Sequence, residues 1–492
     1  MPGEPQPSCD LAPADSSTGI CGEARLFMAA FNQGEKQLPL TIIDQLVEKA
    51  LSGPAPARDS ALQALYQQII LPLCDDFSSR GVTAAAQVLA RVTHLFRSHG
   101  AGAATHSYLE RHRITNEGEM LARYHEISQP RAISEPQRIK KVIVLSRVTI
   151  GADVALISPI IQRLAAALPQ AQLIVVGPAH LPQLFAHPQK TRFLIFPFDR
   201  YSRLAERLSF WPRLHDLLAS EVADLSPEEY ILLDPDSRLS QLGLLPLAPA
   251  RSSYCLNSRQ DQAGSPRLVD ICNRWLDQLL PGSCRFANRI WLKPEQSATA
   301  RSFFKQFKQK SFKIVINLGS GGDPGKELPP PFARQLAASL LAREKTIIFL
   351  DSGCGAREGE AGSKLRRQLR GSQPTGLLAD LKQPPPWSDH GLLQIRADIG
   401  NLAALIAEAD LFIGYDSCCQ HLATASQTPA IICFAGAPNP RFSQRWQPLA
   451  REGLTTTIMI DDELRCQPEE IINQVAQQAE LYRQGALTPQ QA

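Results

Sequence analysis

The sequence has almost no surplus of charge of either sign. Its 492 residues include 51 lysines and arginines against 48 aspartates and glutamates, which gives a formal net charge of +3. Proteins that bind nucleic acid through its phosphates carry a clear basic surplus, so we expect no nucleic-acid partner. With 44% hydrophobic and 20% charged residues, the composition is that of a globular chain, which excludes collagen-like and largely disordered proteins.

Signals for secretion, membrane insertion and cysteine-based sites are also missing. Residues 1–19 have neither the basic nor the apolar segment of a secretory signal. We find no stretch of about 18 apolar residues, the length that a membrane span needs. The 11 cysteines are scattered and form no Cys-x-x-Cys pair with zinc-finger spacing. We therefore expect a cytoplasmic protein with reduced cysteines and no bound metal.

Four segments follow one another along the chain. Residues 1–20 are rich in proline, serine and acidic residues, and we expect a disordered tail there. In residues 21–137 apolar side chains recur three and four positions apart, which predicts an all-α module. Residues 138–293 and 294–485 each alternate apolar strands with amphipathic helices, which predicts two α/β domains. We expect the α-helical module to bind a protein partner.

Each α/β segment contains continuous apolar strands, which are typical of parallel sheets covered by helices on both faces. The expected strands lie within residues 138–147, 171–178, 191–198, 228–236 and 252–259, and then within 311–322, 346–353, 378–383 or 392–398, 409–417 and 428–438. In such sheets ligands bind at the carboxyl ends of the strands, so we expect a cleft between the two domains. The final helix, 469–484, has an apolar face that we expect to pack back on the earlier domain.

A loop after the first strand of the earlier α/β domain contains Arg147, Thr149, Gly151 and Asp153. A glycine between a strand and a helix lets a polar ligand approach backbone N–H groups. Asp153 stands where a carboxylate would cap the following helix, and capping is the alternative to a catalytic role. The absence of GxGxxG and GxxxxGK[ST] here argues against dinucleotide and P-loop sites.

The first strand of the later domain is followed by a glycine-rich loop. Gly319 and Ser320 begin this loop, and Lys326 follows them. Small residues let backbone donors surround a phosphate, and a lysine adds a mobile positive charge. An ordinary flexible loop is the alternative.

The strongest local pattern is the junction between a strand and a helix at residues 415–425. Asp416 and Ser417 end the strand, and the free N–H groups of the next helix favour a diphosphate. His421 lies about one turn into that helix, where it is either a ligand contact or a buried histidine. The adjacent Cys418 and Cys419 have no identified base, so we do not expect redox or nucleophilic chemistry.

A helix over residues 200–219 combines arginines with leucine, phenylalanine and tryptophan. Its arginines are Arg200, Arg203, Arg207 and Arg213. Such a helix suits an anionic membrane surface or a phosphorylated glycolipid, and a helix packed against the protein is the alternative.

These patterns together resemble glycosyltransferase family 9, the heptosyltransferase family, over residues 138–485. Asp153 and Pro159 keep the family's interval between an acidic residue and a helix proline. Residues 416–425 resemble its D-S-G-x-x-H-L-A-x-A signature, and residues 398–406 resemble the stretch before it. The chain departs from the family at Ala152, inserted between glycine and aspartate, and at Cys418, where the signature has glycine.

The resemblance implies a GT-B fold, with two Rossmann-like domains facing each other across a cleft, here preceded by the all-α module. It implies inverting sugar transfer from a nucleotide diphosphate donor, heptose and an ADP-linked donor being candidates, without an obligatory metal or other cofactor. Asp153 would be the general base, and Arg147, Thr149 and Gly151 would form the acceptor-side loop. The donor would bind at the residues singled out in the later domain: Gly319, Ser320, Lys326, Asp416, Ser417, Cys418 and His421.

The acceptor implied is a glycan, a glycolipid or a protein, met in the cytoplasm or at the inner face of the membrane. Two other readings stay open. One is a sugar-nucleotide epimerase of the GT-B type, which would form product without an acceptor. The other is an inactive GT-B protein that serves as a scaffold, a reading that the changes at Ala152 and Cys418 favour slightly.

Overall fold

The computed structural model describes residues 19–186, 191–198, 204–261, 263–307, 311–321, 323–329, 331–353, 355–383, 387–449 and 453–485. The tail expected at residues 1–20 therefore lies, up to residue 18, outside the described residues. The chain divides into two compact units. The first unit is residues 1–123 with 201–214, and the second is residues 124–200 with 215–492.

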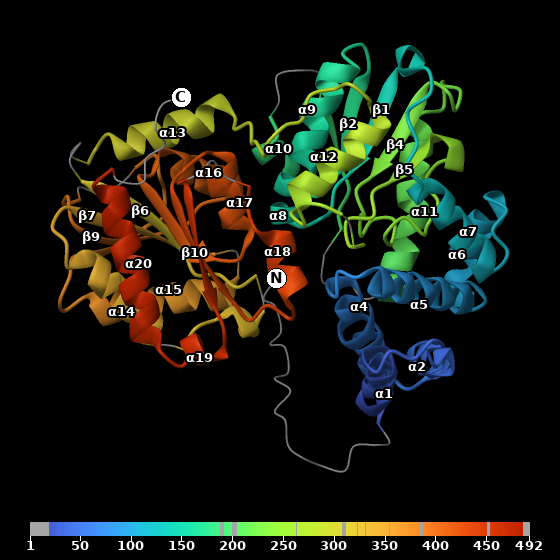
Figure 1. The fold of residues 1–492 in the computed structure, drawn as a ribbon, viewed down its shortest axis with the longest axis horizontal. Coiled ribbons are helices and arrows are strands. Elements are labelled where there is room, and N and C mark those ends of the chain that lie inside the picture. Colours follow the sequence, from blue (N-terminus) through green and yellow to red (C-terminus); the bar gives the residue numbers. More distant parts are fainter. Residues whose placement is uncertain are drawn as a thin grey trace. The chain divides into compact units, whose positions relative to one another are not determined.

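The first unit is helical, as the spacing of its apolar residues predicts; its helices are the blue ones in Figure 1. They are α1 (Ile20–Asn32), α2 (Leu40–Ser52), α3 (Ala55–Gln63), α4 (Leu71–Asp75), α5 (Ser79–Arg97), α6 (Ala103–Arg111) and α7 (Glu117–Ser128), of which α7 runs into the second unit. Arg91 of α5 donates to Asp44 of α2 and to Glu117 of α7, each at 2.6 Å. This arginine ties three helices together.

A later segment completes the helical unit. The helix α11 (Leu204–Glu221) belongs to this unit as far as Leu214. Its Arg207 lies 4.1 Å from the ring centre of Tyr66, which is a cation–π contact. Arg207 and Trp211 are both buried.

For Arg207 and Trp211 the alternative of a helix packed against the protein is therefore correct, because buried side chains cannot face a membrane. Arg213 is exposed, whereas Arg200 and Arg203 lie outside the described residues.

The second unit contains two sheets whose strands are all parallel. The first sheet has the order β3-β2-β1-β4-β5. Its strands are β1 (Lys141–Leu145), β2 (Gln172–Gly177), β3 (Thr191–Ile195), β4 (Tyr230–Asp234) and β5 (Ser253–Cys255). β1 lies at the centre and pairs Val144 with Val175 on one side and Leu233 on the other. Both faces of this central strand are buried, since Val142 to Leu145 are all inside the protein, and this explains why it is almost wholly apolar.

One helical run after β1 is long and apolar enough to span a membrane by length and composition, contrary to the expectation that no stretch reaches that length. It extends over Ile150–Ala167, and 72% of it is buried inside the protein. Its parts are α8 (Ile150–Ala152), a π-helical turn (Asp153–Ile157) and α9 (Ser158–Ala167). The burial is that of a core helix, so the run is weak evidence for a membrane span. The first sheet is also covered by α10 (Leu181–Leu184) and α12 (Leu268–Leu279).

The second sheet has the order β12-β11-β10-β6-β7-β9-β8. Its strands are β6 (Phe312–Asn317), β7 (Thr346–Asp351), β8 (Thr375–Leu378), β9 (Gly391–Ile395), β10 (Leu411–Tyr415), β11 (Ala430–Ala435) and β12 (Thr455–Ile460). Its helices are α13 (Pro294–Phe304), α14 (Pro331–Leu341), α15 (Ala356–Leu369), α16 (Ile399–Glu408), α17 (Cys418–Ala425), α18 (Pro440–Trp446), α19 (Asp462–Arg465) and α20 (Pro468–Arg483). Of the two alternatives, 392–398 is confirmed as a strand, whereas 378–383 is wrong because β8 ends at Leu378.

The expectation that the last helix packs back on the earlier domain is wrong. The apolar side of α20, including Ile471, Val475 and Tyr482, belongs to the core of the second sheet. Arg483 at its end donates to the carbonyl of Glu344 at 3.2 Å. Its apolar face is therefore already buried against the sheet that precedes it in sequence.

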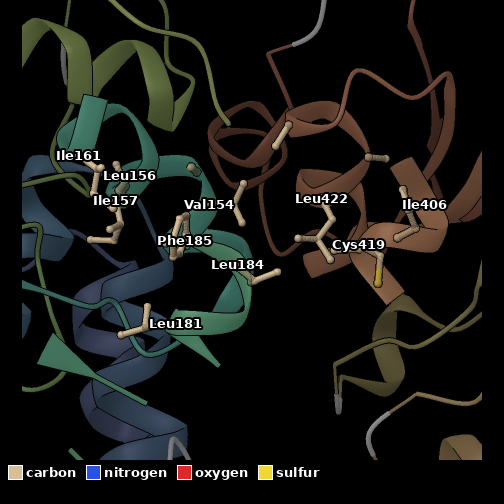
Figure 2. Close-up of a cluster of buried hydrophobic side chains, with 14 of the residues drawn as sticks. Val154, Leu156, Ile157, Ile161, Leu181, Leu184, Phe185, Ile406, Cys419 and Leu422 are labelled. Carbon is tan, nitrogen blue, oxygen red and sulfur yellow. The ribbon is translucent and has the colours of Figure 1, made fainter. Parts of the chain in front are cut away.

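Side chains from both sheets share one hydrophobic cluster. Figure 2 shows Val154 and Leu184, from the side of the first sheet, opposite Leu422 and Cys419 of α17. A hydrogen bond joins α10 to α16, since the backbone N–H of Gly400 donates to the side-chain Oε1 of Gln183 at 3.3 Å. These contacts bring the carboxyl end of β1 close to the start of α17.

Candidate functional site

The predicted donor-side residues gather at the carboxyl ends of β6 and β10. These strands are neighbours, and Asn317 is paired with Gly414. Lys326 Nζ lies 2.6 Å from Asp416 Oδ2 and 3.3 Å from the carbonyl oxygen of Asp416. Asp416 also accepts from Gln420 Nε2 at 2.7 Å. The carboxylate thus binds donors within the protein and holds Lys326 at the strand ends, as its charge predicts.

The glycine-rich loop is held by its own side chains. The N–H of Gly319 donates to Asn317 Oδ1 at 3.1 Å, and Ser320 Oγ donates to Glu327 Oε1 at 2.9 Å. A Cβ at Gly319 would lie 2.8 Å from Glu358 Oε1. The loop is therefore packed against a carboxylate, and Gly319 is needed for that close approach.

The helix α17 begins without a side-chain cap. Ser417 occupies its N-cap position with extended backbone, but its hydroxyl caps no N–H of the first turn. That hydroxyl oxygen is buried and has no hydrogen-bond partner among the described residues. An uncapped helix start beside Lys326 offers N–H donors, a hydroxyl and a positive charge to an anion.

Cys418 and His421 lie on the first turn of α17, facing the first sheet. A Cβ at Gly151 would lie 2.8 Å from His421 Cδ2 and 3.3 Å from Cys418 Cα. Gly151 therefore permits α8 to meet α17, and the structure brings this acceptor-side residue together with two donor-side ones. Cys418 is half-buried, and its Sγ lies 4.0 Å from that of Cys419.

His421 is buried, and burial lowers its pKa to about 4. The Asp416 carboxylate acts in the opposite direction, and the Lys326 ammonium lowers the pKa further. The imidazole is therefore neutral at pH 7, and its ring meets that of Trp446 edge to face at 5.9 Å. Its Nδ1 is buried and has no partner among the described residues.

This lowered pKa predicts how stability depends on pH. Unfolding returns His421 to a pKa near 6.5, so the unfolded chain binds the extra proton between about pH 6.5 and 4. The free energy of unfolding should therefore fall as the pH is lowered from about 6.5 to about 4, by up to about 1.4 kcal/mol per pH unit from this group. Urea unfolding of His421→Gln at several pH values should show a shallower fall than the wild type. His390→Gln, at the amino end of β9, is the control, and an equal fall in all three proteins would contradict the prediction.

Asp153 does not cap a helix, contrary to one of the two roles considered. Thr149 is the N-cap of α8, and Asp153 follows that helix and belongs to the next turn. Its side chain reaches back to the loop, where it accepts from the Arg147 N–H at 2.7 Å and from Ser146 Oγ at 2.8 Å. The carboxylate thus stabilises the loop that follows β1.

His180 is a residue that the sequence reading missed. It follows β2, and its Nε2 lies 3.1 Å from Asp153 Oδ2. Because β1 and β2 are adjacent parallel strands, residues just after each of them meet at one edge of the sheet. The segment 178–180 directly follows an apolar strand, but nothing in its sequence points to Asp153, because their contact depends on the order of β1 and β2.

Arg147 contacts the loops that follow β4 and β5. It is buried, and its Nη1 lies 2.7 Å from Ser258 Oγ and 3.8 Å from Asp236 Oδ2. Burial lowers its pKa to about 9, the Arg259 guanidinium lowers it further and the Asp236 carboxylate raises it. Arg147 thus holds the loops after β4 and β5 together. Thr149 is half-buried.

Asp351 is a second residue that the sequence reading missed. It ends β7, next to β6, and accepts from Asn317 Nδ2 at 2.6 Å. Burial raises its pKa to about 6, against the effect of the Asn317 hydrogen bond. It lies at the same edge of the sheet as Lys326 and Asp416.

Among the described residues no group of three or more His, Cys, Asp or Glu could hold a metal ion, and the expectation of no metal stays a prediction.

Comparisons with known proteins show a family match and a similar fold. Residues 392–473, which include the start of α17, match the model of glycosyltransferase family 9 (heptosyltransferase). Among solved structures, the chain is similar to a glycosyl transferase family 9 protein from Veillonella parvula, with a TM-score of 0.51 and 18% identity over 70% of this chain and 98% of that one. It is also similar to the E. coli heptosyltransferase WaaC with ADP, with a TM-score of 0.44 and 14% identity over 69% and 99%. No curated protein matches. The predicted fold is confirmed.

Proposed function

We propose that this chain, which has the GT-B fold and resembles glycosyltransferase family 9 at residues 392–473, moves a sugar from a nucleoside diphosphate donor to an acceptor hydroxyl. One observation carries the proposal. The uncapped start of α17, with Ser417, lies beside the Lys326–Asp416 pair at the carboxyl ends of neighbouring strands. This is where a parallel sheet binds phosphorylated ligands.

Each group has a chemical task in this proposal. The Ser417 hydroxyl and the first-turn N–H groups of α17 bind the diphosphate oxygens. Lys326 stabilises the charge that grows on the diphosphate as the bond to the sugar breaks. Asp416 holds the lysine in place, and the neutral imidazole of His421 supports the first turn of α17 without adding charge.

The finer points of the proposal are inverting transfer without a metal, and an ADP-linked heptose as the donor. Inversion follows if an acceptor oxygen attacks the sugar on the face opposite the diphosphate. The similar WaaC structure is a complex with ADP, which makes ADP the first nucleotide to try. The acceptor would be a glycan, glycolipid or protein, met in the cytoplasm or at the inner face of the membrane.

Nucleotide binding tests the proposal. ADP, UDP, GDP and CMP are each added to the wild-type chain, and the shift in Tm is measured. We expect one nucleoside diphosphate to raise Tm, and Ser417→Ala to lose most of that rise. The matched control is Ser426→Ala, at the other end of α17, where a buried serine oxygen also lacks a partner among the described residues.

The same experiment separates the alternatives. A wild-type chain whose Tm does not respond to any nucleotide, and that turns over no nucleotide sugar, is a scaffold rather than a transferase. Release of an altered nucleotide sugar without an acceptor would indicate an epimerase.

A further inference from the structure

The group expected to accept the proton during transfer is closed off from solvent. The Asp153 side chain has no exposed surface. Its two oxygens accept from Ser146 Oγ, from the Arg147 N–H and from His180 Nε2, at 2.7 to 3.1 Å. In this arrangement an acceptor hydroxyl reaches the carboxylate only if one of these donors moves away from it.

His180 is the member of this group that reaches the surface. Its side chain is 15% exposed, and it lies between the end of β2 and the start of α10. The helix α10 in turn contacts α16 of the second sheet through Gln183 and Gly400. His180 is thus placed on the side of the first sheet that meets the donor-side residues.

The hydrogen bond to Asp153 gives the imidazole a defined form. Because the carboxylate accepts at Nε2, the neutral ring carries its proton there, and Nδ1 is left with its lone pair. Asp153 is the one partner of the ring in the part of the chain that the structure describes. A buried carboxylate behind an imidazole fixes its orientation and stabilises its cation.

We infer that His180 is the catalytic base of the proposed transfer and that Asp153 is the residue that positions it, an inference that rests on the proposed function. His180 Nδ1 takes the proton of the acceptor hydroxyl while that oxygen forms a bond to the anomeric carbon of the sugar. The bond from this carbon to the diphosphate oxygen breaks, and the electron pair leaves with the nucleoside diphosphate. The imidazolium that results is balanced by the Asp153 carboxylate.

The test measures steady-state transfer from a nucleotide sugar by the full chain. His180→Ala should lower kcat by about 100- to 10,000-fold, the usual share of a general base, without changing the Tm shift that the nucleotide causes. Added imidazole should restore part of the rate to His180→Gly, which a merely structural histidine would not permit. Asp153→Asn should lower kcat without adding to the loss in His180→Ala.

His390→Ala is the control histidine, and it should keep the rate. If the wild type is active while His180→Ala keeps its rate within about threefold, the inference is overturned and the transferase proposal stands. It is also overturned if imidazole does not rescue His180→Gly. A wild type that turns over no nucleotide sugar overturns the transferase proposal, and this inference with it.

Discussion

Replacing Lys326 with alanine is expected to lower kcat for sugar transfer by about 100- to 1,000-fold. The loss arises because the negative charge on the leaving diphosphate grows in the transition state, where a fixed cation contributes most. Lys326 is a cation that the structure places at the ends of β6 and β10, 2.6 Å from Asp416. Steady-state kinetics of transfer measure the effect. Lys326→Arg should keep part of the rate, because it keeps the charge but changes the geometry.

The chain offers a matched control for this substitution. Lys313 stands at the amino end of the same strand, β6, and pairs with Asp410 at 3.6 Å. Its side chain is as enclosed as that of Lys326, with 13% exposed against 12%. Lys313→Ala should reproduce the cost in stability without the loss in kcat. Equal losses of kcat in both variants would show that Lys326 acts only through stability.

Replacing Gly436 with alanine should lower activity although no residue proposed to bind the donor is itself replaced. Gly436 follows β11 with a φ of +66°, and a Cβ there would lie 2.1 Å from the carbonyl oxygen of Gly325 and 3.1 Å from the N of Lys326. The backbone turn that carries Lys326 must then move. We expect a loss of about 3 kcal/mol in the free energy of unfolding, from backbone strain and overpacking together. We also expect kcat/KM to fall at least tenfold.

Urea unfolding and transfer kinetics check this second prediction. Gly282→Ala is the control for backbone strain, because Gly282 has a φ of +78° but no atom within 4 Å of its would-be Cβ. It should lose stability without losing kcat/KM. If Gly436→Ala behaves like Gly282→Ala, the close approach to Gly325 has no role in placing Lys326.

The features of the fold and of the candidate site that could be predicted from sequence are those with a local physical cause. Continuous apolar runs predicted the parallel strands, because a strand buried on both faces has no polar side. The junction at Asp416 and Ser417 predicted the start of α17. Lys326 and Asp416 were predicted to belong to one donor site, because each follows an apolar strand of the later α/β domain.

The parts that could not be predicted depend on contacts between distant segments. The direction of the Asp153 side chain is set by Ser146 and by the loop N–H groups, which no spacing rule reports. The apolar face of α20 fits either sheet in principle, and only tertiary packing decides between them. His180 became visible only when the order of β1 and β2 was known.

The segment 204–214 has a consequence for how the chain is made. The helical unit is assembled from residues up to 123 and from this later segment, whose Arg207 and Trp211 are buried in it. On the ribosome, β1, β2 and β3 all emerge before that segment does. The first part of the chain to be synthesised must therefore wait for a later part before it can close its core. A fragment that starts at the first sheet would leave the apolar side of residues 204–214 uncovered. A fragment that ends before the first sheet would lack residues 204–214 and would leave the core of the helical unit open.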